Sequence, residues 1–431
     1  MISLRLGLRN LFRNRWRSGL TLAAVGVAVA LMVWSVAFLN GWLNEMVRAT
    51  TAMESLQAQV QTVEYVRNPR VYRTFELDRE QLARIREIQG VEAVTPRAEL
   101  HGLIGTEQRS LVGRLIGVDP VAEAAATPIA KAIISGRWLA AEPAPFDGPR
   151  ETVLGQGLAR QLRVGLGDEL VVFLEAADGS LGNELLGVKG IVRTGNTMLD
   201  RTAVYVHLED ARFVGALGHG MHHLAIQTVD GPAGRAAAEA VAGVLGAAFG
   251  TPPDHVAVGD ADLVVRPWQE LEPSLANMIE LFRSAYWILY LLIYLVAAVG
   301  VLNTQRMSAM ERRREFGVMI AIGMRPRRMF RTLMAETAVL GLVGAAIGAT
   351  LGGLVSWYHS VAGLDLAMFS STDGGFSYMG VSFSERLIFD LSAGAIIQPV
   401  LIMVGVAMLS GLVPAVSAAR IDPAPTIAGR T

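Results

Sequence analysis

Four long stretches of the chain lack charged side chains and are apolar over most of their length. They cover residues 18–44, 284–305, 337–364 and 391–419. An α-helix rises about 1.5 Å per residue, so roughly twenty apolar residues cross a hydrocarbon layer about 30 Å thick. The pattern predicts a membrane domain of four transmembrane helices, at residues 18–44, 284–305, 332–358 and 391–419.

Residues 45–283 have a different pattern, in which charged residues return and strand-like alternation mixes with helical spacing. Strands are expected at 56–66, 91–104, 109–118, 169–174, 185–192, 203–206 and 224–229, and helices at 77–88, 155–164, 208–217 and 232–249. Asp78 can cap the first of these helices, and Asp178-Gly179 predicts a hairpin turn. A segment of this size can bury its own core, so we expect a large mixed α/β domain inserted between the first and second transmembrane helices.

The end of this segment has helical spacing that continues into the second apolar stretch. From Trp268 to Arg283 nothing interrupts the pattern. We therefore expect one long stalk helix that begins in the α/β domain and enters the membrane. The proline-rich residues 140–149 are expected to form an exposed loop.

The distribution of charge predicts which segments face the cytoplasm. Residues 306–331 are strongly basic, whereas residues 359–390 are net acidic. Short basic segments stay in the cytoplasm, and long domains cross the membrane whatever their charge. We therefore expect residues 306–331 and the tail, 420–431, to be cytoplasmic, and residues 45–283 and 359–390 to be extracytoplasmic.

The N-terminal residues, 1–17, contain five arginines and no acidic residue. Their leucines share one helical face, which predicts an amphipathic helix on the cytoplasmic membrane surface. A cleaved signal peptide is the alternative for residues 1–44. Its apolar core would be shorter and followed by a small-residue cleavage site, so we favour an uncleaved anchor.

The basic segment between the second and third transmembrane helices also has apolar positions. It holds eight arginines and two glutamates between Asn303 and Arg331. A signal that only fixes topology has no use for an apolar helical face, but Phe316, Val318, Met319, Ile320 and Ile322 form one. The pattern favours an amphipathic helix, ended by Gly323 and Pro326, that presents its Met and Phe side chains to a cytoplasmic partner.

Two further features concern the third and fourth predicted helices. Gly344, Gly348 and Gly352 recur every fourth residue, which lets another helix approach closely, either within one subunit or in a dimer. Pro399 and Pro414 are expected to kink or end the fourth helix.

Glu336 lies at the cytoplasmic edge of the third predicted helix and is a candidate functional acid, because ionisable residues at that depth are costly. The interpretation we favour is an acid near the helix N-terminus, close to Arg331 and Arg328.

Composition excludes several kinds of chemistry. The chain has no cysteine and a formal net charge of −1, which excludes thiolate chemistry and gives no basic field for nucleic acid. It contains no phosphate-binding loop, no nucleophile elbow and no zinc-protease motif. His219, His222 and His223 are close in sequence, but without further ligands they favour a polar turn over a metal site. We expect no catalytic site, cofactor or metal in this chain.

Four motifs together resemble the FtsX/MacB-type permeases of ABC transporters, the type VII or mechanotransmission group. They are residues 9–21 (RNLFRNRWRSGLT), residues 310–324 (MERRREFGVMIAIGM), Glu336 with the glycine stripe, and residues 412–423 (LVPAVSAARIDP). Softer motifs at residues 117–120, 136–138, 153–159 and 164–168 resemble the LolC/LolE lipoprotein-releasing branch. In LolC-type subunits a proline-containing loop recruits a periplasmic chaperone, but here the matching residues, 175–184, are short and lack proline.

The resemblance implies a non-catalytic subunit of the bacterial inner membrane whose extracytoplasmic domain has MacB-like porter and Sabre subdomains. Its partners would be two copies of a separate ABC ATPase, which binds ATP and Mg, and a second permease copy or a paralogue. Lipoprotein or another extracytoplasmic substrate, membrane lipid and a periplasmic chaperone complete the implied partners. The ATPase-coupling residues would be Glu311, Arg312, Arg313, Arg314, Glu315, Phe316, Gly317, Met319, Ile320, Gly323 and Met324.

Three functions are compatible with the resemblance. The one we favour is extraction of lipoproteins from the inner membrane for transfer toward the outer membrane, driven by ATP hydrolysis in the partner. MacB-like efflux of a drug, peptide or toxin through a periplasmic tube is the second. FtsX-like mechanical regulation of cell-wall hydrolases is the third.

Overall fold

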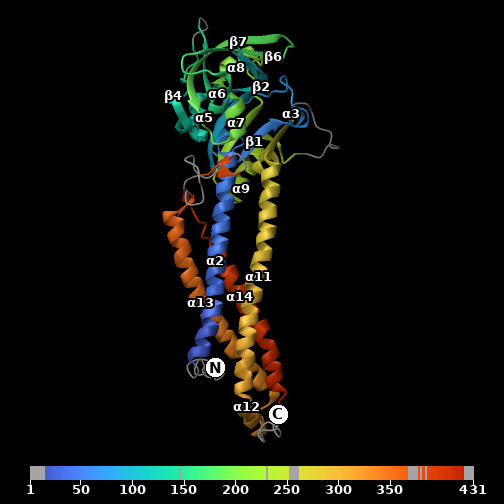
Figure 1. Cartoon of the computed structure of the whole chain (residues 1–431). Coiled ribbons are helices and arrows are strands. Elements are labelled where there is room, and N and C mark those ends of the chain that lie inside the picture. Colours follow the sequence, from blue (N-terminus) through green and yellow to red (C-terminus); the bar gives the residue numbers. More distant parts are fainter. Residues whose placement is uncertain are drawn as a thin grey trace. The chain divides into compact units, whose positions relative to one another are not determined.

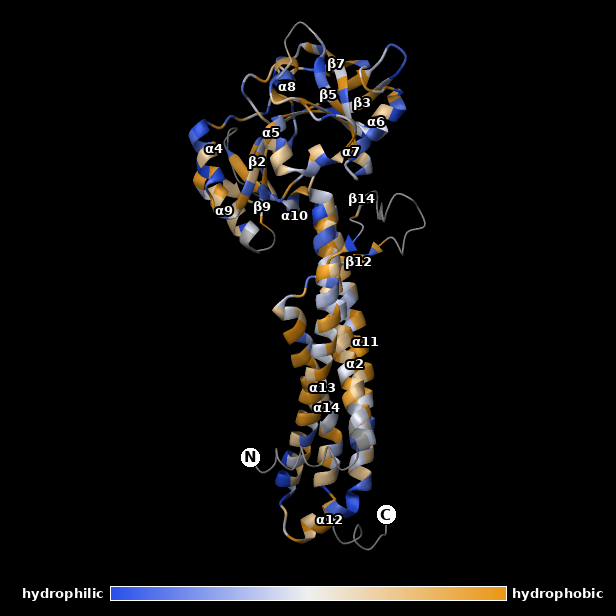
Figure 2. Cartoon of the chain, turned by 90° about the vertical axis from the view of Figure 1, so that its left-hand side faces the viewer, coloured by the Kyte–Doolittle hydropathy of each residue, from blue (hydrophilic) through white to orange (hydrophobic). Residues whose placement is uncertain are grey.

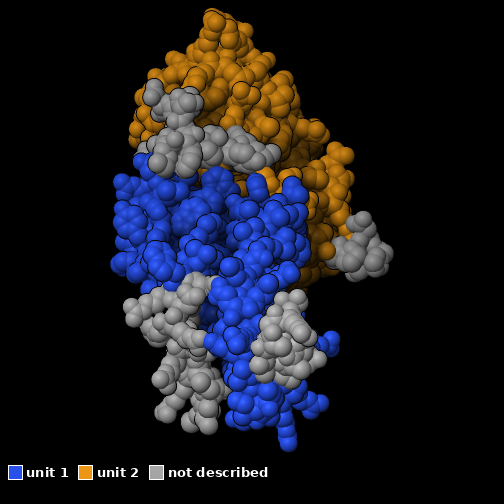
Figure 3. Space-filling model, turned by 60° about the horizontal axis from the view of Figure 1, so that its bottom comes forward, with its two compact units in different colours: residues 1–45, 279–368, 385–431 blue, residues 46–278, 369–384 orange. Residues whose placement is uncertain are grey.

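The computed structural model describes residues 15–144, 148–229, 232–251, 262–366, 377–378, 381–383 and 386–421. The chain divides into two compact units, which Figure 3 colours separately. Unit 1 comprises residues 1–45, 279–368 and 385–431, and unit 2 comprises residues 46–278 and 369–384. The amphipathic helix predicted at residues 1–17 lies outside the described residues except for its last three.

Four long helices account for most of unit 1. They are α2 (Arg15–Thr51), α11 (Pro273–Glu311), α13 (Pro326–Ala362) and α14 (Ala393–Ala419), and the short α12 (Arg313–Ala321) lies between α11 and α13 (Figure 1). Among the described residues, these four helices are the ones long and apolar enough to cross a membrane. Figure 2 shows the hydrophobic colouring that continues along all four. The prediction of four such helices is confirmed.

The four long helices share one apolar cluster within unit 1. Its buried side chains include Val25, Val29, Met32, Val33, Tyr294, Ala297, Val301, Ala345, Met403 and Ala407. Helices that cross a membrane are held together by close packing of this kind, because lipid is as apolar as the side chains.

Prolines set one helix boundary and leave another helix intact. The predicted unbroken helix from Trp268 is wrong, because a short helix, α10 (Trp268–Leu271), is separated from α11 by Glu272. The ring of Pro273 disfavours helical geometry at the residue before it, and Glu272 accordingly has φ −122° and ψ 65°. Pro399 and Pro414 lie inside α14, and neither ends it.

Unit 2 is built on one eleven-stranded mixed sheet. Its strand order in the described part of the chain is β10-β11-β1-β9-β2-β3-β8-β5-β7-β4, with β6 pairing to β2 and β7. The strands are β1 (Ala58–Thr62), β2 (Val91–Gly105), β3 (Ser110–Val118), β4 (Ile133–Gly136), β5 (Arg150–Gly155), β6 (Glu169–Glu175), β7 (Leu181–Val192), β8 (Ala203–His207), β9 (His223–Thr228), β10 (Ala248–Phe249) and β11 (Leu263–Pro267).

Short helices connect these strands. They are α3 (Val63–Arg67), α4 (Arg79–Arg86), α5 (Pro120–Ala126), the 3₁₀ helix η1 (Pro128–Ala132), α6 (Gln156–Leu162), α7 (Thr197–Thr202), α8 (Leu208–Val214) and α9 (Pro232–Leu245). Two short antiparallel ladders, β12 (Leu364–Asp365) with β15 (Arg386–Leu387) and β13 (Ser377–Tyr378) with β14 (Val381–Ser382), follow α13. Strands and helices alternate irregularly, so the predicted mixed α/β class is confirmed.

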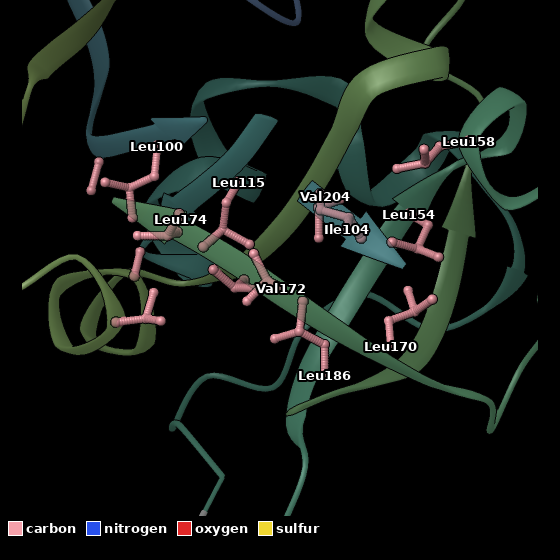
Figure 4. Close-up of a cluster of buried hydrophobic side chains, with 14 of the residues drawn as sticks. Leu100, Ile104, Leu115, Leu154, Leu158, Leu170, Val172, Leu174, Leu186 and Val204 are labelled. Atoms are coloured by element: carbon pink, nitrogen blue, oxygen red, sulfur yellow. The ribbon is translucent and has the colours of Figure 1, made fainter. Parts of the chain in front are cut away.

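Two apolar cores stabilise unit 2. Figure 4 shows the larger one, which contains strand side chains such as Leu100, Leu115 and Val204 together with Leu158 of α6. The other lies around Val60, Ile226, Val241 and Val265. Because side chains alternate along a strand, the neighbours of the first core's residues point to the opposite face of the sheet. Those neighbours include Glu99, Arg114 and Tyr205, which form a polar cluster described below.

Several local predictions for unit 2 are confirmed and others need correction. Asp78 caps α4 in a capping box with Gln81, as expected. The strand expected at residues 56–66 ends at Thr62, because the Thr62 side chain caps α3. The helix expected to reach Phe249 ends at Leu245, and Gly246, with φ +61°, turns the chain into β10. Strands β4, β5, β10 and β11 were not predicted.

Candidate functional site

The basic segment between α11 and α13 folds into a compact elbow. Helix α11 ends at Glu311, Arg312 turns the chain, and α12 follows at once. Gly323 then adopts φ +97°, a value that disfavours residues with a side chain, and Pro326 begins α13. The helix predicted before Gly323 and Pro326 is confirmed, and it ends at Ala321.

The apolar face of α12 packs against its own chain. The Phe316 side chain is 1% exposed and lies in a cluster with Met329 of α13 and Ala418 of α14. Partly buried members of the cluster are Ala309, Met319, Ile320, Met324, Leu333 and Ile421. The expectation that Phe and Met side chains of α12 face a partner is therefore wrong for Phe316, because its ring fills an internal pocket.

Arg312 and Glu336 form an ion pair at the base of the elbow. Arg312 Nη1 lies 3.1 Å from Glu336 Oε2, and their side chains are 21% and 12% exposed. Arg312 Nε also approaches Glu315 Oε2 at 3.4 Å, and the guanidinium lies 5.1 Å from the centre of the Phe316 ring. The interpretation of Glu336 as an acid near the helix N-terminus is wrong. Glu336 lies ten residues after Pro326, where α13 begins, and it pairs with Arg312.

A second set of residues from the elbow points to solvent, and we call it the elbow surface. It consists of Arg306, Met307, Met310 and Glu311 from α11, and Arg313, Arg314, Val318, Ala321 and Ile322 from or beside α12, all of them exposed. The residues from α11, with Asn303, line a shallow hollow of about 510 Å³. The surface mixes arginines with apolar side chains, and among the large apolar ones Ile322 is the most exposed, at 81%.

The glycine stripe of α13 packs against α2 of the same chain. A Cβ atom on Gly344 would lie 2.8 Å from Val25 Cγ1, and one on Gly348 would lie 2.3 Å from the Gly26 carbonyl oxygen. A Cβ on Gly352 would lie 2.6 Å from the Ala30 carbonyl oxygen. Of the two alternatives, the structure places the stripe in a contact within one subunit.

The three histidines do not gather around a common point. Among the described residues, no group of histidine, aspartate or glutamate side chains is arranged to hold a metal ion. The two ring nitrogens of His222 contact the Glu99 amide and the Val71 carbonyl, at 3.0 and 2.9 Å. His223 is buried in the sheet, and burial lowers its pKa to about 3. His219 is exposed.

The sequence interpretation missed a buried network of charges in unit 2. Arg97 holds Glu123 through two hydrogen bonds of 3.0 and 2.6 Å, and it donates to the main-chain carbonyls of Met53 and Glu54 in the turn after α2. Arg114 bridges the carboxylates of Glu54, at 2.6 Å, and Glu99, at 3.1 Å. Charged residues at alternate positions of apolar strands were the signal that could have revealed it.

Comparison with known proteins places both units in described families. The MacB-like periplasmic core domain matches residues 18–244, and the FtsX-like permease C-terminal domain matches residues 287–423. The lipoprotein-releasing system transmembrane protein LolC of Neisseria meningitidis is 23% identical over 425 residues, which are 96% of this chain and 94% of that protein.

Other relatives match over shorter stretches. The ABC transporter permease YtrF of Bacillus subtilis is 31% identical over 29% of this chain and 28% of its own length. The macrolide export ATP-binding/permease protein MacB of a Shewanella species is 30% identical over 37% of this chain and 21% of its own length. The four apolar helices, the inserted α/β domain and these family matches show that the chain is a membrane protein and belongs to the FtsX/MacB/LolC-type ABC transporter permeases.

Proposed function

We propose that this permease extracts lipoproteins from the inner membrane for transfer toward the outer membrane, driven by ATP hydrolysis in a separate ATPase. The observation that carries the proposal is the extent of the LolC match, which covers 96% of this chain and 94% of that protein. The MacB match covers 21% of that protein, so it supports a shared permease part and not a shared function.

The elbow surface is the proposed docking site for the ATPase. Exposed arginines such as Arg313 and Arg314 can pair with acidic residues, and the apolar side chains between them can fill a groove. Phe316 and the Arg312–Glu336 pair hold α12 against the neighbouring helices α13 and α14. A displacement of α12 would therefore move α13 and α14 with it. The working complex would hold two ATPase copies, which bind ATP and Mg, and a second permease chain.

The β6–β7 hairpin carries no proposed role in chaperone binding. Its turn is tight, with the Ala176 amide donating to the Ser180 carbonyl at 2.9 Å and Asp178 accepting from Ser180. A short, closed turn offers little backbone to a partner.

A reconstituted release assay tests the proposed function. The permease, its ATPase and a fluorescent lipoprotein are placed in proteoliposomes with the α/β domain outside and the ATPase inside. ATP is enclosed when the vesicles form, and the lipoprotein released to the outside is counted. We expect ATP-dependent release that stops when Ile322 is replaced by Asp, with Arg79→Glu, an exposed arginine of unit 2, as the matched control.

Two results would count against the proposal. Lipoprotein that stays in the vesicles while ATP is hydrolysed would exclude release as the function. Release that needs no ATP, or that continues in the Ile322→Asp variant, would show that the elbow surface does not couple the ATPase to the substrate.

A further inference from the structure

Unit 2 contains a polar cavity of about 140 Å³ beside the charged face of its sheet. It lies next to the turn that follows α2 and next to Glu272, the residue that precedes α11. A buried water needs only about 10–15 Å³ of such space, so this cavity can hold a group of several atoms.

The cavity has more negative than positive charge. Glu54, Glu99 and Glu272 line it, and Arg114 forms ion pairs with the first two of these carboxylates. The other lining arginine, Arg97, is already matched by Glu123 outside the cavity lining. Three carboxylates therefore face Arg114 as their one remaining cation, and a positively charged ligand would restore the balance.

Four buried polar atoms that line the cavity have no hydrogen-bond partner within the described chain. They are Ser55 Oγ, Arg114 Nε, Tyr205 Oη and His223 Nδ1. Ser55 and Tyr205 are each 2% exposed and His223 is 5% exposed, so bulk solvent does not reach them freely. Buried polar groups are usually paired, and three of these four atoms, those of Ser55, Tyr205 and His223, can accept a hydrogen bond from a ligand in the charged cavity.

Of the three carboxylates, Glu272 is the one whose negative charge is least balanced by a neighbouring positive charge. Burial and then the neighbouring Glu54 raise its pKa, and Arg114 only partly opposes them. The charges of its neighbours thus balance its negative charge poorly.

We propose that this cavity binds a small organic cation through a primary ammonium group. The three N–H donors of an ammonium suit a site rich in acceptors: three carboxylates, two hydroxyl oxygens and the unprotonated nitrogen of His223. A directly coordinated metal ion is disfavoured, because no described cluster of acidic and histidine side chains has the arrangement to hold one. The site is independent of the proposed function.

Binding of ethylammonium to the purified full-length chain in detergent tests the proposal. Saturation-transfer NMR gives the dissociation constant for the unmodified protein and for Glu272→Gln, Tyr205→Phe and the exposed control Glu87→Gln. We expect Glu272→Gln to weaken binding about tenfold or more and Tyr205→Phe about threefold, because they remove a charged and a neutral hydrogen-bond partner. Glu87→Gln should bind as the unmodified protein does.

Tyr205→Phe removes a hydroxyl that has no hydrogen-bond partner among the described residues, so the variant should fold, and its melting temperature without ligand serves as the check. The proposal is overturned if ethylammonium shows no saturable binding, which is the result for a cavity filled by water alone. It is also overturned if the cavity variants bind as well as Glu87→Gln, or if magnesium chloride binds there and ethylammonium does not.

Discussion

Arg312 makes three contacts that need the flat guanidinium group. It pairs with Glu336, approaches Glu315 and covers the Phe316 ring. A lysine could keep one ion pair, but its single ammonium cannot stack on the ring and reach two carboxylates together. The residue thus links the end of α11 to α12 and α13, and it explains why an arginine follows directly after the last residue of α11.

His223 gives unit 2 a pH-dependent stability. Burial holds its pKa at about 3, well below the ordinary value of 6.5, and Glu99 only partly opposes that effect. Below pH 6.5 the unfolded chain binds a proton that the folded chain does not, so stability falls as the pH drops from 6.5 toward 3. Replacing His223 with Gln should therefore reduce the loss of stability between pH 6.5 and pH 3.

The measurement is the unfolding temperature at a series of pH values for the unmodified chain, His223→Gln and His219→Gln. His219 is exposed and serves as the control, so its replacement should leave the slope unchanged. An equally steep slope in His223→Gln would contradict the assignment.

At the scale of elements, sequence patterns predicted most of the structure where local chemistry decides the outcome. Runs of uncharged residues predicted the long helices, and Asp78 and Gly323 marked helix ends correctly. Elements decided by distant partners were missed. Strand β11, for example, has three strand-forming residues, Leu263 to Val265, too few to predict a strand by themselves, and it forms because it pairs with β1, far earlier in the chain.

The candidate site was predicted in the same uneven way. The elbow and its residues followed from the pattern and the resemblance, but the direction of α12 did not. An amphipathic helix has an apolar face whether it packs on its own chain or on a partner, so periodicity could not separate the two. The pairing of Arg312 with Glu336 likewise depends on how α13 leaves the elbow.

The contact between α2 and α13 depends on Gly348. A Cβ there would lie 2.3 Å from the Gly26 carbonyl oxygen, so Gly348→Ala forces the two helices apart. Overpacking of this kind costs about 1–3 kcal/mol. We expect a lower melting temperature, measured on the full-length chain in detergent.

Gly353 is the matched control, because a Cβ there has nothing within 4 Å. Alanine is preferred over glycine in helices by about 1 kcal/mol, so Gly353→Ala should be neutral or stabilising. Equal melting temperatures for the two variants would mean that the stripe does not hold α2 and α13 together.

The two faces of α12 should respond differently to substitution. Phe316→Ala empties an internal site, and a buried Phe→Ala change costs about 3–5 kcal/mol, so both stability and ATPase binding should fall. Ile322→Asp changes a side chain that is 81% exposed, so it should leave the melting temperature unchanged and weaken the ATPase in a pull-down.

The pull-down and the melting temperature are measured on the same preparations. Undiminished co-purification of the ATPase with Ile322→Asp would show that the partner binds elsewhere. An unchanged melting temperature in Phe316→Ala would show that the ring does not brace the elbow.

For the whole molecule, the proposed mechanism requires that force crosses the membrane from the elbow to unit 2. The two units are connected by continuous helices, since α2 runs from Arg15 to Thr51 and α11 from Pro273 to Glu311, each across the boundary between the units. A helix is stiff along its axis, so displacement of the elbow would be carried along α11 as far as Pro273. Because the helix is interrupted at Glu272, the displacement would pass from α11 to the strands and short helices of unit 2 at that residue.

The sidedness of the two units is the expectation on which this mechanism depends, and the absence of cysteine makes it testable. Single substitutions Ser180→Cys, in the exposed β6–β7 turn, and Arg314→Cys, on the elbow surface, each provide one accessible thiol. In intact spheroplasts a membrane-impermeant maleimide should label Ser180→Cys at once and Arg314→Cys only after the membrane is permeabilised, because the basic elbow should be retained in the cytoplasm. Lysed cells give the full labelling of each variant as the control for reactivity. Labelling of both variants in intact spheroplasts, or of neither, would put the elbow and unit 2 on the same side, and no force applied by a cytoplasmic ATPase would then need to cross the bilayer.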